Sequence, residues 1–278
     1  MSTIDHMMSV VSALDSAAEG ARRLGFEVTD RSVHTGRGTA NRLIVLPNCY
    51  WELLAVEEST PANEMLRAAP SNPGLLGCAL SSRDVAADRF SSQANGIPVD
   101  APVQFSRPVE IDKMQKLASF ETAFIRPQEK FDGLFFFCRH LTPELIWRET
   151  WMDHKNGVDG ILGVDVVSTD VRTAVVFLSR LFRAYAAAEV EGSVCIDLGA
   201  LDIQVMTEAT YASYYPVNPT AGSIGALGAF AGLRLKVRSL ERLARQLSEQ
   251  GVSARYSNGG LFVKEDSMGN TIIHFAEK

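Results

Sequence analysis

The fold is decided by residues 3–56, which read TIDHMMSVVSALDSAAEGARRLGFEVTDRSVHTGRGTANRLIVLPNCYWELLAV. Residues 3–11 are typical of a strand. Residues 15–24 predict a helix, with Asp15 as a plausible N-cap and Gly25 as the stop after its C-terminus. Three more apolar-rich segments follow, separated by turn-forming residues. The predicted order is therefore strand, helix, strand, strand, strand.

The same order recurs along the chain, with units that begin near residues 3, 74, 160 and 231. Prolines lengthen the connections of the second unit, and the final strand of the third unit is blurred. In the fourth unit Leu240, Leu243 and Leu247 share one face of a helix over residues 239–250, which predicts packing on a sheet. The sequence thus predicts an α+β fold of about four tandem βαβββ units that form curved mixed sheets.

The domain organisation follows from the same repeat. Residues 141–160 show no clear periodicity but carry two of the three tryptophans, which favours an ordered linker over a loose tether. We expect an N-terminal paired-unit domain over residues 1–140 and a C-terminal paired-unit domain over residues 161–278.

Composition narrows the class of protein. Apolar residues make up 46% and charged residues 22%, as in a soluble globular protein, and the net charge of −6 argues against nucleic acid as a partner. No apolar run reaches the roughly 18–20 residues of a membrane span. The N-terminus has no leading basic patch and does not resemble a signal peptide, and the four scattered cysteines suit reduced thiols. These features predict a cytoplasmic protein that acts on a small molecule, and a homodimer is one assembly that they allow.

His6 and Glu52 are polar residues inside apolar strands. A carboxylate between Trp51 and Leu53 is costly to bury unless it is paired, hydrogen-bonded or bound to a metal. An imidazole and a carboxylate from two strands of one sheet are suitable ligands for a divalent ion such as Zn, Fe, Mn, Ni or Co. The alternative is a hydrogen-bonded histidine of the core or rim.

Three stretches resemble the opening module of glyoxalase-like proteins of the vicinal oxygen chelate superfamily: IDHMMSVVSALDSAAEGARRLGF, GTANRLIVL and CYWELLAV. The later FFFCRHLTPELIW and HKNGVDGILGV resemble the middle of the same family, and specific motifs cover roughly residues 1–185. The resemblance implies paired-module cups in which the first strand offers His or Gln and the last strand offers Glu. Those positions map onto His6 and Glu52. The superfamily includes isomerases, ring-cleaving dioxygenases, epimerases, thiol transferases and metal-free antibiotic-binding proteins, so the fold does not fix the reaction.

The second unit departs from this pattern. Its first strand, around residues 75–78, offers no His, Gln or Glu. Its last strand offers Cys138 and His140, which are two apart and therefore share a face. We take His140 as a third metal ligand and place Cys138 in the substrate pocket, with ligation as its second option. Alternatively, His140 caps a carbonyl before Pro143.

The linker carries three further candidates. His154 could close over the cup as a general acid or base, or could shape the turn that ends at Gly157. Trp147 and Trp151 are four apart and could wall an apolar substrate pocket, or could only pin the linker to the sheets.

The connection around Gly36 and Gly38 could reach the cup mouth. Asn41 is expected to contact a polar substrate or to orient a metal ligand, and His34 lies nearby. Arg37 and Arg42 are expected on the solvated surface.

The family's ligand positions look empty in the third and fourth units. Asp165 is the acidic candidate there, and His274 lacks an obvious partner. We therefore interpret the C-terminal half as structural, dimerising or pocket-shaping.

Three functional hypotheses follow. The first is a metal-dependent lyase, isomerase or dioxygenase acting on a small oxygen-chelating substrate. The second is a non-catalytic protein of the same fold that binds and sequesters a small apolar molecule. The third is an enzyme that works without metal through His140 and His154.

Overall fold

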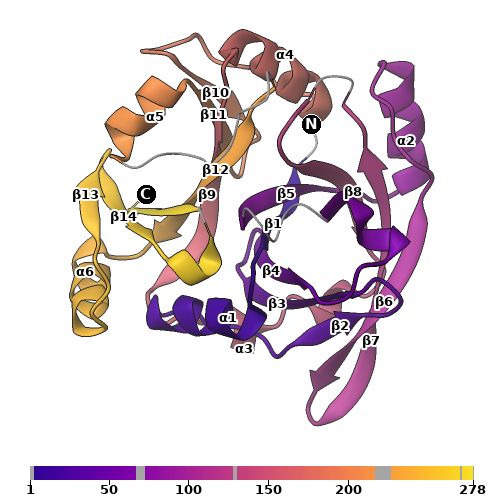
Figure 1. Cartoon of the computed structure of the whole chain (residues 1–278), viewed down its shortest axis with the longest axis horizontal. Helices are drawn as coiled ribbons and strands as arrows, with labels where there is room; N and C mark the ends of the chain where they lie inside the picture. Colours follow the sequence, from indigo (N-terminus) through magenta and orange to yellow (C-terminus); the bar gives the residue numbers. More distant parts are fainter. Residues whose placement is uncertain (1–2, 67–72, 128–129, 217–226, 270, 278) are drawn as a thin grey trace.

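The computed structural model describes residues 3–66, 73–127, 130–216, 227–269 and 271–277. It confirms an α+β fold with two mixed sheets, one of eight strands and one of seven. Figure 1 shows the eight-stranded sheet curling into an almost closed ring, with the seven-stranded sheet beside it. This is the arrangement expected of paired vicinal oxygen chelate cups.

The first two units build the eight-stranded sheet in the order β2-β3-β4-β1-β5-β8-β7-β6. The first unit comprises β1 (Ile4–Val10), α1 (Leu14–Arg23), β2 (Ser32–His34), β3 (Thr39–Val45) and β4 (Tyr50–Val56). The second comprises β5 (Gly74–Ser81), α2 (Val85–Ala94), β6 (Val103–Ile111), β7 (Met114–Ile125) and β8 (Leu134–His140). The short helix η1 (Pro61–Leu66) lies between them in the chain.

The two end strands of this sheet approach each other. The Ser32 hydroxyl of β2 donates a hydrogen bond of 2.5 Å to the carbonyl of Pro108 in β6. Proline has no N–H for a strand ladder, so it is tolerated at the end of a sheet. The side-chain contact replaces ladder pairing at the seam, and the sheet becomes a nearly barrel-shaped cup.

The first strands of the two units pair antiparallel with a matched pair of irregularities. His6 is opposite Ala79 and Met8 is opposite Gly77, and the register shifts on either side of these pairs. Asp5 is the extra residue on β1, and Leu76 is the extra residue on β5. Aligning the two extra residues, Asp5 and Leu76, places Gly77 at the position in β5 that His6 occupies in β1.

The last two units build the seven-stranded sheet in the order β10-β11-β9-β12-β15-β14-β13. The third unit comprises β9 (Val158–Val167), α4 (Val171–Phe182), β10 (Ser193–Asp197) and β11 (Asp202–Met206), and α5 (Glu208–Tyr214) follows it. The fourth comprises β12 (Ala229–Val237), α6 (Leu240–Glu249), β13 (Arg255–Ser257), β14 (Gly260–Lys264), η4 (Asp266–Met268) and β15 (Ile272–Ala276).

The third unit is one strand short. Between α4 and β10 the described chain forms only isolated bridges, from Ala186 to Ile196 and from Val190 to Ser193. β11 runs parallel to β9, as β4 runs parallel to β1, so β11 takes the position of the unit's final strand, which the sequence predicted after it. The strand that the third unit lacks is therefore the first one after α4, where the described chain forms isolated bridges instead.

The helix ends follow from local sequence, with one correction. Gly25 adopts φ +87° after α1, and the Phe26 N–H bonds to the carbonyl of Ala21, which is the left-handed stop the sequence predicts. Asp15 is not the N-cap: Ala13 holds that position, and Asp15 lies in the first turn, where it accepts from Arg42. An acid there still suits the positive end of the helix dipole.

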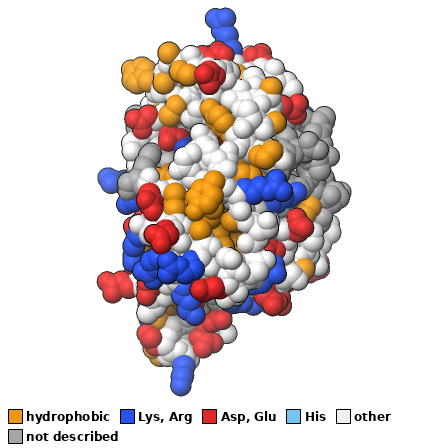
Figure 2. Space-filling model, turned by 90° about the vertical axis from the view of Figure 1, so that its left-hand side faces the viewer, with side chains coloured by type: hydrophobic (Ala, Val, Ile, Leu, Met, Phe, Trp, Pro, Cys, Tyr) orange, Lys and Arg blue, Asp and Glu red, His pale blue; other side chains and the backbone are white. Residues whose placement is uncertain are grey.

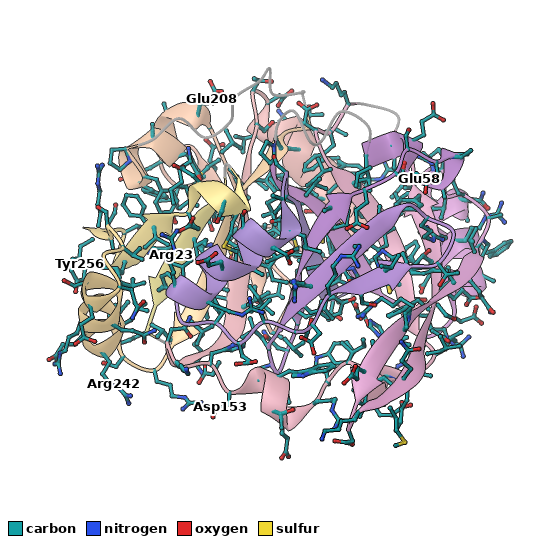
Figure 3. All side chains as sticks on the ribbon, turned by 60° about the horizontal axis from the view of Figure 1, so that its bottom comes forward. Arg23, Glu58, Asp153, Glu208, Arg242 and Tyr256 are labelled. Atoms are coloured by element: carbon teal, nitrogen blue, oxygen red, sulfur yellow. The ribbon has the colours of Figure 1, made fainter. Side chains whose placement is uncertain are left out.

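The two sheets share one hydrophobic core, whose members include Trp51 of β4 and Leu247 of α6. Polar links also join the halves: Arg23 of α1, labelled in Figure 3, pairs with Glu265 at 2.7 Å, and the Leu75 N–H donates to the Thr271 hydroxyl. The linker contains the short helices η3 (Pro143–Leu145) and α3 (Glu149–Met152).

On the left-hand face of Figure 1, which Figure 2 turns toward the viewer, acidic and basic side chains are interspersed among scattered hydrophobic ones. Within the described ranges, every helix falls short of the length and apolar character that a membrane crossing requires.

Candidate functional site

The inner face of the cup surrounds a cavity that opens to solvent. Every strand of the first two units except β5 contributes side chains to it, as does η1. β5 presents small residues instead, and a Cβ at Gly77 would lie 2.6 Å from the Met8 side chain. A cavity with this mainly apolar and aromatic lining and a few polar side chains suits a small organic ligand.

His6 lies in the wall of this cavity, and Asp5 lies behind it. The side chains of consecutive strand residues normally point to opposite faces, but the irregularity in β1 brings Asp5 to the same histidine. His6 Nδ1 is 2.7 Å from Asp5 Oδ1, and the His6 ring stacks on Tyr50 with centroids 4.3 Å apart. His6 is thereby fixed from two sides.

His140 shares the same carboxylate, since its Nε2 is 2.9 Å from Asp5 Oδ1. Cys138, two residues earlier on β8, completes a buried group with Asp5, His6 and His140 whose ligand atoms all lie within 4.8 Å of one another. These four residues could hold a metal ion. His6 and Cys138 line the cavity.

Glu52 faces His6 from the cavity side. Its Oε2 is 3.8 Å from His6 Nε2, and its Oε1 is 3.7 Å from His34 Nε2. Asn41 donates to Glu52 Oε1 at 2.6 Å and lies 3.2 Å from His34 Nε2. The predicted ligand pair His6 and Glu52 is thus brought together, with Asn41 in a position to orient the carboxylate.

Burial would raise the pKa of Asp5, but the neighbouring His140 and His6 outweigh burial and hold that pKa well below its usual range. The carboxylate is therefore ionised and accepts from His6 Nδ1–H, and His6 Nε2 lies on the side of Glu52. Burial raises the pKa of Cys138 well above its usual value, with Asp5 and Glu52 adding to the effect, so the metal-free thiol keeps its proton. Burial lowers the pKa of His34 to about 4, and this ring is neutral at neutral pH.

The second unit lacks the family's ligand types at the equivalent positions. Gly77 corresponds to His6. Glu52 is paired with the residue two places after His6, and Phe136 is paired with the residue two places after Gly77. Phe136 is therefore the counterpart of Glu52. Cys138 lies two residues further along β8 and does not take the place of the glutamate.

Donor atoms of the site nevertheless fit a divalent ion. Two buried carboxylates face three imidazoles, and Asn41 Oδ1 and His140 Nδ1 are buried without a hydrogen-bond partner among the described residues. Buried polar atoms without partners are rare in native structures, so both atoms are available to bind a further group. Carboxylate, imidazole and thiolate are all ligand types that first-row divalent metals accept.

The two linker tryptophans lie in different places. Trp147 packs on His140, with ring centroids 4.8 Å apart, and on Tyr50 at 5.7 Å, so it supports the candidate site from behind. Trp151 lines a separate surface pocket near Arg31 and Glu110. The structure does not bring Trp151 into the main cavity.

His154 is also outside the main cavity. Its Nδ1 accepts from the Glu27 N–H at 2.9 Å, and its Nε2 donates to the Val45 carbonyl at 2.9 Å. Both ring nitrogens are therefore engaged by the backbone of the first unit. This arrangement makes His154 a tie between the linker and β3.

The equivalent region of the second sheet is filled by an ion-pair network. Arg234 of β12 donates to Asp165 of β9 at 2.7 Å and also contacts Asp202 of β11. Tyr215 donates to Asp165, and its ring lies 5.6 Å from that of His274. Asp165 is thus paired with an arginine.

Sequence reasoning missed Asp5 and Arg107. Strict strand alternation places Asp5 on the opposite face from His6, and a single irregular residue in β1 reverses that placement.

In the sequence VQFSRPVEI, Arg107 has the pattern of an ordinary charged residue at a strand edge, but it is buried and lines the cavity. Arg37, expected on the solvated surface, is half-buried in the same cavity, with its guanidinium 4.0 Å from the centroid of the Phe105 ring. The alternation of Phe105 and Arg107 on β6 is the signal that could have found Arg107.

Comparisons with solved structures agree with this fold. A hypothetical protein from Staphylococcus aureus is similar with a TM-score of 0.72 and 15% identity, over 100% of both chains. A mutant of 4-hydroxymandelate synthase from Streptomyces coelicolor gives 0.62 and 13%, over 99% of this chain and 92% of that one. A xylose isomerase-like TIM barrel/4-hydroxyphenylpyruvate dioxygenase fusion protein gives 0.62 and 12%, over 99% of this chain and 48% of that one. At these identities the likeness shows the fold alone.

No curated protein matches the chain. The sequence family described as a glyoxalase-like domain matches residues 4–182, which is more than half of the 278 residues and covers every residue of the cavity described above. The chain therefore belongs to the family of glyoxalase-like domains.

Proposed function

We propose that this protein is a metal-dependent enzyme that acts on a small oxygen-chelating substrate in the β1–β8 cavity. The observation that carries the proposal is the position of His6 between two buried carboxylates, with Asp5 at its Nδ1 and Glu52 at its Nε2. A carboxylate behind a histidine fixes the ring and raises its basicity as a ligand. His6 and Glu52 are then the ligands on the cavity side.

The remaining residues have supporting roles. Asp5 holds the rings of His6 and His140 at once, and Tyr50 stacks on His6. Asn41 restrains the Glu52 carboxylate through its hydrogen bond to Oε1. Aromatic side chains around the cavity exclude water from the reacting groups, which strengthens every electrostatic interaction there.

A bound divalent ion would supply Lewis-acid polarisation of the substrate oxygens at this place. The reaction class, lyase, isomerase or dioxygenase, then depends on the metal and the substrate. Iron content together with oxygen consumption would favour a dioxygenase, whereas zinc or nickel would favour lyase or isomerase chemistry.

The group of Asp5, His6, Cys138 and His140 is a second arrangement for the ion, and it shares His6 with the first. The two arrangements predict different ligands. His6→Ala removes a ligand from both, Glu52→Gln from the cavity-side pair only, and His140→Gln from the group of four only.

The proposal is tested by metal analysis of protein purified without a histidine tag. We expect about one divalent ion per chain, with a strong loss in His6→Ala and Glu52→Gln, because a site loses affinity when a ligand is removed. His274→Gln is the matched control, since this buried histidine belongs to the other sheet. Retained metal in Glu52→Gln with loss in His140→Gln would move the ion to the group of four. A content below ~0.2 ions per chain that His6→Ala leaves unchanged would contradict metal dependence altogether.

A non-catalytic binding protein of the same fold is the second candidate. Gly77 and Phe136 favour it, because half of the family's ligand positions hold residues that cannot bind a metal. This candidate predicts ligand binding that survives chelator treatment and His6→Ala.

A further inference from the structure

Arg107 is a buried cation without a hydrogen-bond or ion-pair partner in the part of the chain that the structure describes. It lies on the inner face of β6, 4% exposed, and makes no hydrogen bond or ion pair with any described residue. Its one ring contact is with Phe120, whose centroid is 5.7 Å from the guanidinium carbon. Arginine carries five N–H donors and a permanent charge, and burying it unpaired is costly. The position of Arg107 in the wall of a cavity marks a place for an anion.

The second sheet contains a buried arginine with a structural role, Arg234, with which Arg107 can be compared. Arg234 is placed between Asp165 and Asp202 and donates to both. Arg107 has Glu52 and Tyr50 in its surroundings but is not within ion-pair distance of either. Arg107 thus lacks, among the described residues, the kind of carboxylate partner that Arg234 has.

A second cation faces the same cavity. The Arg37 guanidinium lies over the Phe105 ring and, like that of Arg107, has no hydrogen bond or ion pair to a described residue. Phe105 and Arg107 are two apart on β6, so both cations lie along the same strand of the wall. Two cations beside one strand of the wall would orient a ligand that has one anionic end.

The rest of the wall is apolar and aromatic. Phe120, Phe124 and Phe136 line the cavity, together with Tyr50 and Leu134. Such a lining buries the body of an aromatic or aliphatic molecule and leaves its charged end to the arginines. A doubly charged phosphate would be repelled by the nearby Glu52, whereas a carboxylate matches the guanidinium fork with a single charge.

We propose that the cavity binds an apolar or aromatic monocarboxylate, with its carboxylate on Arg107 and Arg37 and its body against the phenylalanines. This inference rests on the proposed function in that the carboxylate would be the substrate of the same site. It does not require the metal, because Arg107 and Arg37 are not ligands.

The test compares 3-phenylpropanoate with its neutral amide by calorimetric titration of the full chain, metal-loaded and chelator-treated. A charge-assisted contact to a buried arginine should make the acid bind at least about tenfold more tightly than the amide. Arg107→Gln should abolish this preference, and Arg107→Lys should retain part of it. Arg126→Gln is the matched control, because Arg126 also lies near a phenylalanine ring but is exposed and paired with Asp100.

Equal binding of acid and amide by the wild type, or an unchanged preference in Arg107→Gln, overturns the inference. A preference that depends on the metal and not on Arg107 also overturns it, since the carboxylate would then lie on the ion. Failure of the metal proposal would be seen separately, in metal analysis.

Thermal unfolding of Arg107→Met gives a second readout. Removing an unpaired buried charge should leave the melting temperature equal or higher, because no internal bond is lost and a desolvation cost is relieved. A clearly lower melting temperature would mean that Arg107 serves structure, which contradicts its assignment to a ligand.

Discussion

At the scale of single residues, Asp5 holds the candidate site together. One carboxylate oxygen accepts from both His6 and His140, and these rings in turn contact Tyr50 and Trp147. The shared acceptor explains why two strands from different units present their histidines at the same point. Changing Asp5 should therefore affect both histidines at once.

We predict that Asp5→Asn lowers the free energy of unfolding by about 2 kcal/mol, because a buried ionised acceptor of two hydrogen bonds is removed. Urea unfolding at pH 7 with chelator present measures this loss. Asp15→Asn is the control, since the Asp15 side chain is exposed on α1 and should cause no measurable change. Equal effects of the two substitutions would contradict the role of Asp5.

The pH dependence of the same pair of proteins gives a further prediction. The pKa of Asp5 is lowered in the folded state, so its stabilisation is present above the unfolded-state value of about 3.9 and is lost as the pH falls below it. The stability difference between wild type and Asp5→Asn should accordingly shrink below about pH 4. A difference that stays constant down to pH 2.5 would argue against an ionised Asp5.

At the scale of secondary-structure elements, His154 connects the linker to the first unit. It accepts from the Glu27 N–H and donates to the Val45 carbonyl, which requires a neutral ring with its hydrogen on Nε2. Burial lowers the pKa of His154, against smaller opposing contributions from Val45 and Asp153. The neutral form of His154 therefore holds the linker to the first unit through these two hydrogen bonds.

We predict that His154→Gln lowers the free energy of unfolding by about 1–2 kcal/mol at pH 8, because two backbone groups lose a partner of the right geometry. The folded-state pKa lies below the unfolded value of about 6.5, so the contribution is complete above that pH and is lost as the pH falls. Wild type should lose more stability between pH 8 and pH 5 than His154→Gln does. Metal content should be the same in both proteins, and a selective loss of activity in the folded variant would instead favour the general acid or base role.

The irregularities in β1 and β5 illustrate what strand elements contribute. The same register shift occurs in both strands, but only the first unit places a polar residue there, Asp5, where the second places Leu76. The site is asymmetric because the two units carry different residues on matched backbones.

At the scale of the whole molecule, the two sheets are not independent. A single core cluster spans both, and Asn48 of the first half bonds to the Ile161 backbone of the second through both its amide nitrogen and its oxygen. Arg23 and Glu265 add an ion pair across the same boundary.

We predict that the chain unfolds in one transition. Leu247→Ala, in α6 of the C-terminal half, should cost about 2–5 kcal/mol through the cavity it leaves. The three tryptophans, Trp51, Trp147 and Trp151, all precede the second sheet, so their fluorescence reports on the first half. The fluorescence and far-ultraviolet transitions should shift together in this variant. An unshifted fluorescence transition would mean that the halves unfold separately.

The sequence by itself determined the repeated strand and helix order and the stop of α1 at Gly25, because these depend on periodicity and local backbone conformation. It also singled out His6 and Glu52, since polar residues inside apolar strands are expensive wherever the strands lie.

Only the tertiary structure decided which groups meet. Asp5 reaches His6 because of one extra residue in a strand pair, and Arg107 is buried because the sheet closes at Ser32 and Pro108. The path of the linker keeps His154 and Trp151 outside the cavity. Register and closure arise from contacts between residues far apart in the chain, and spacing along the sequence carries no information about them.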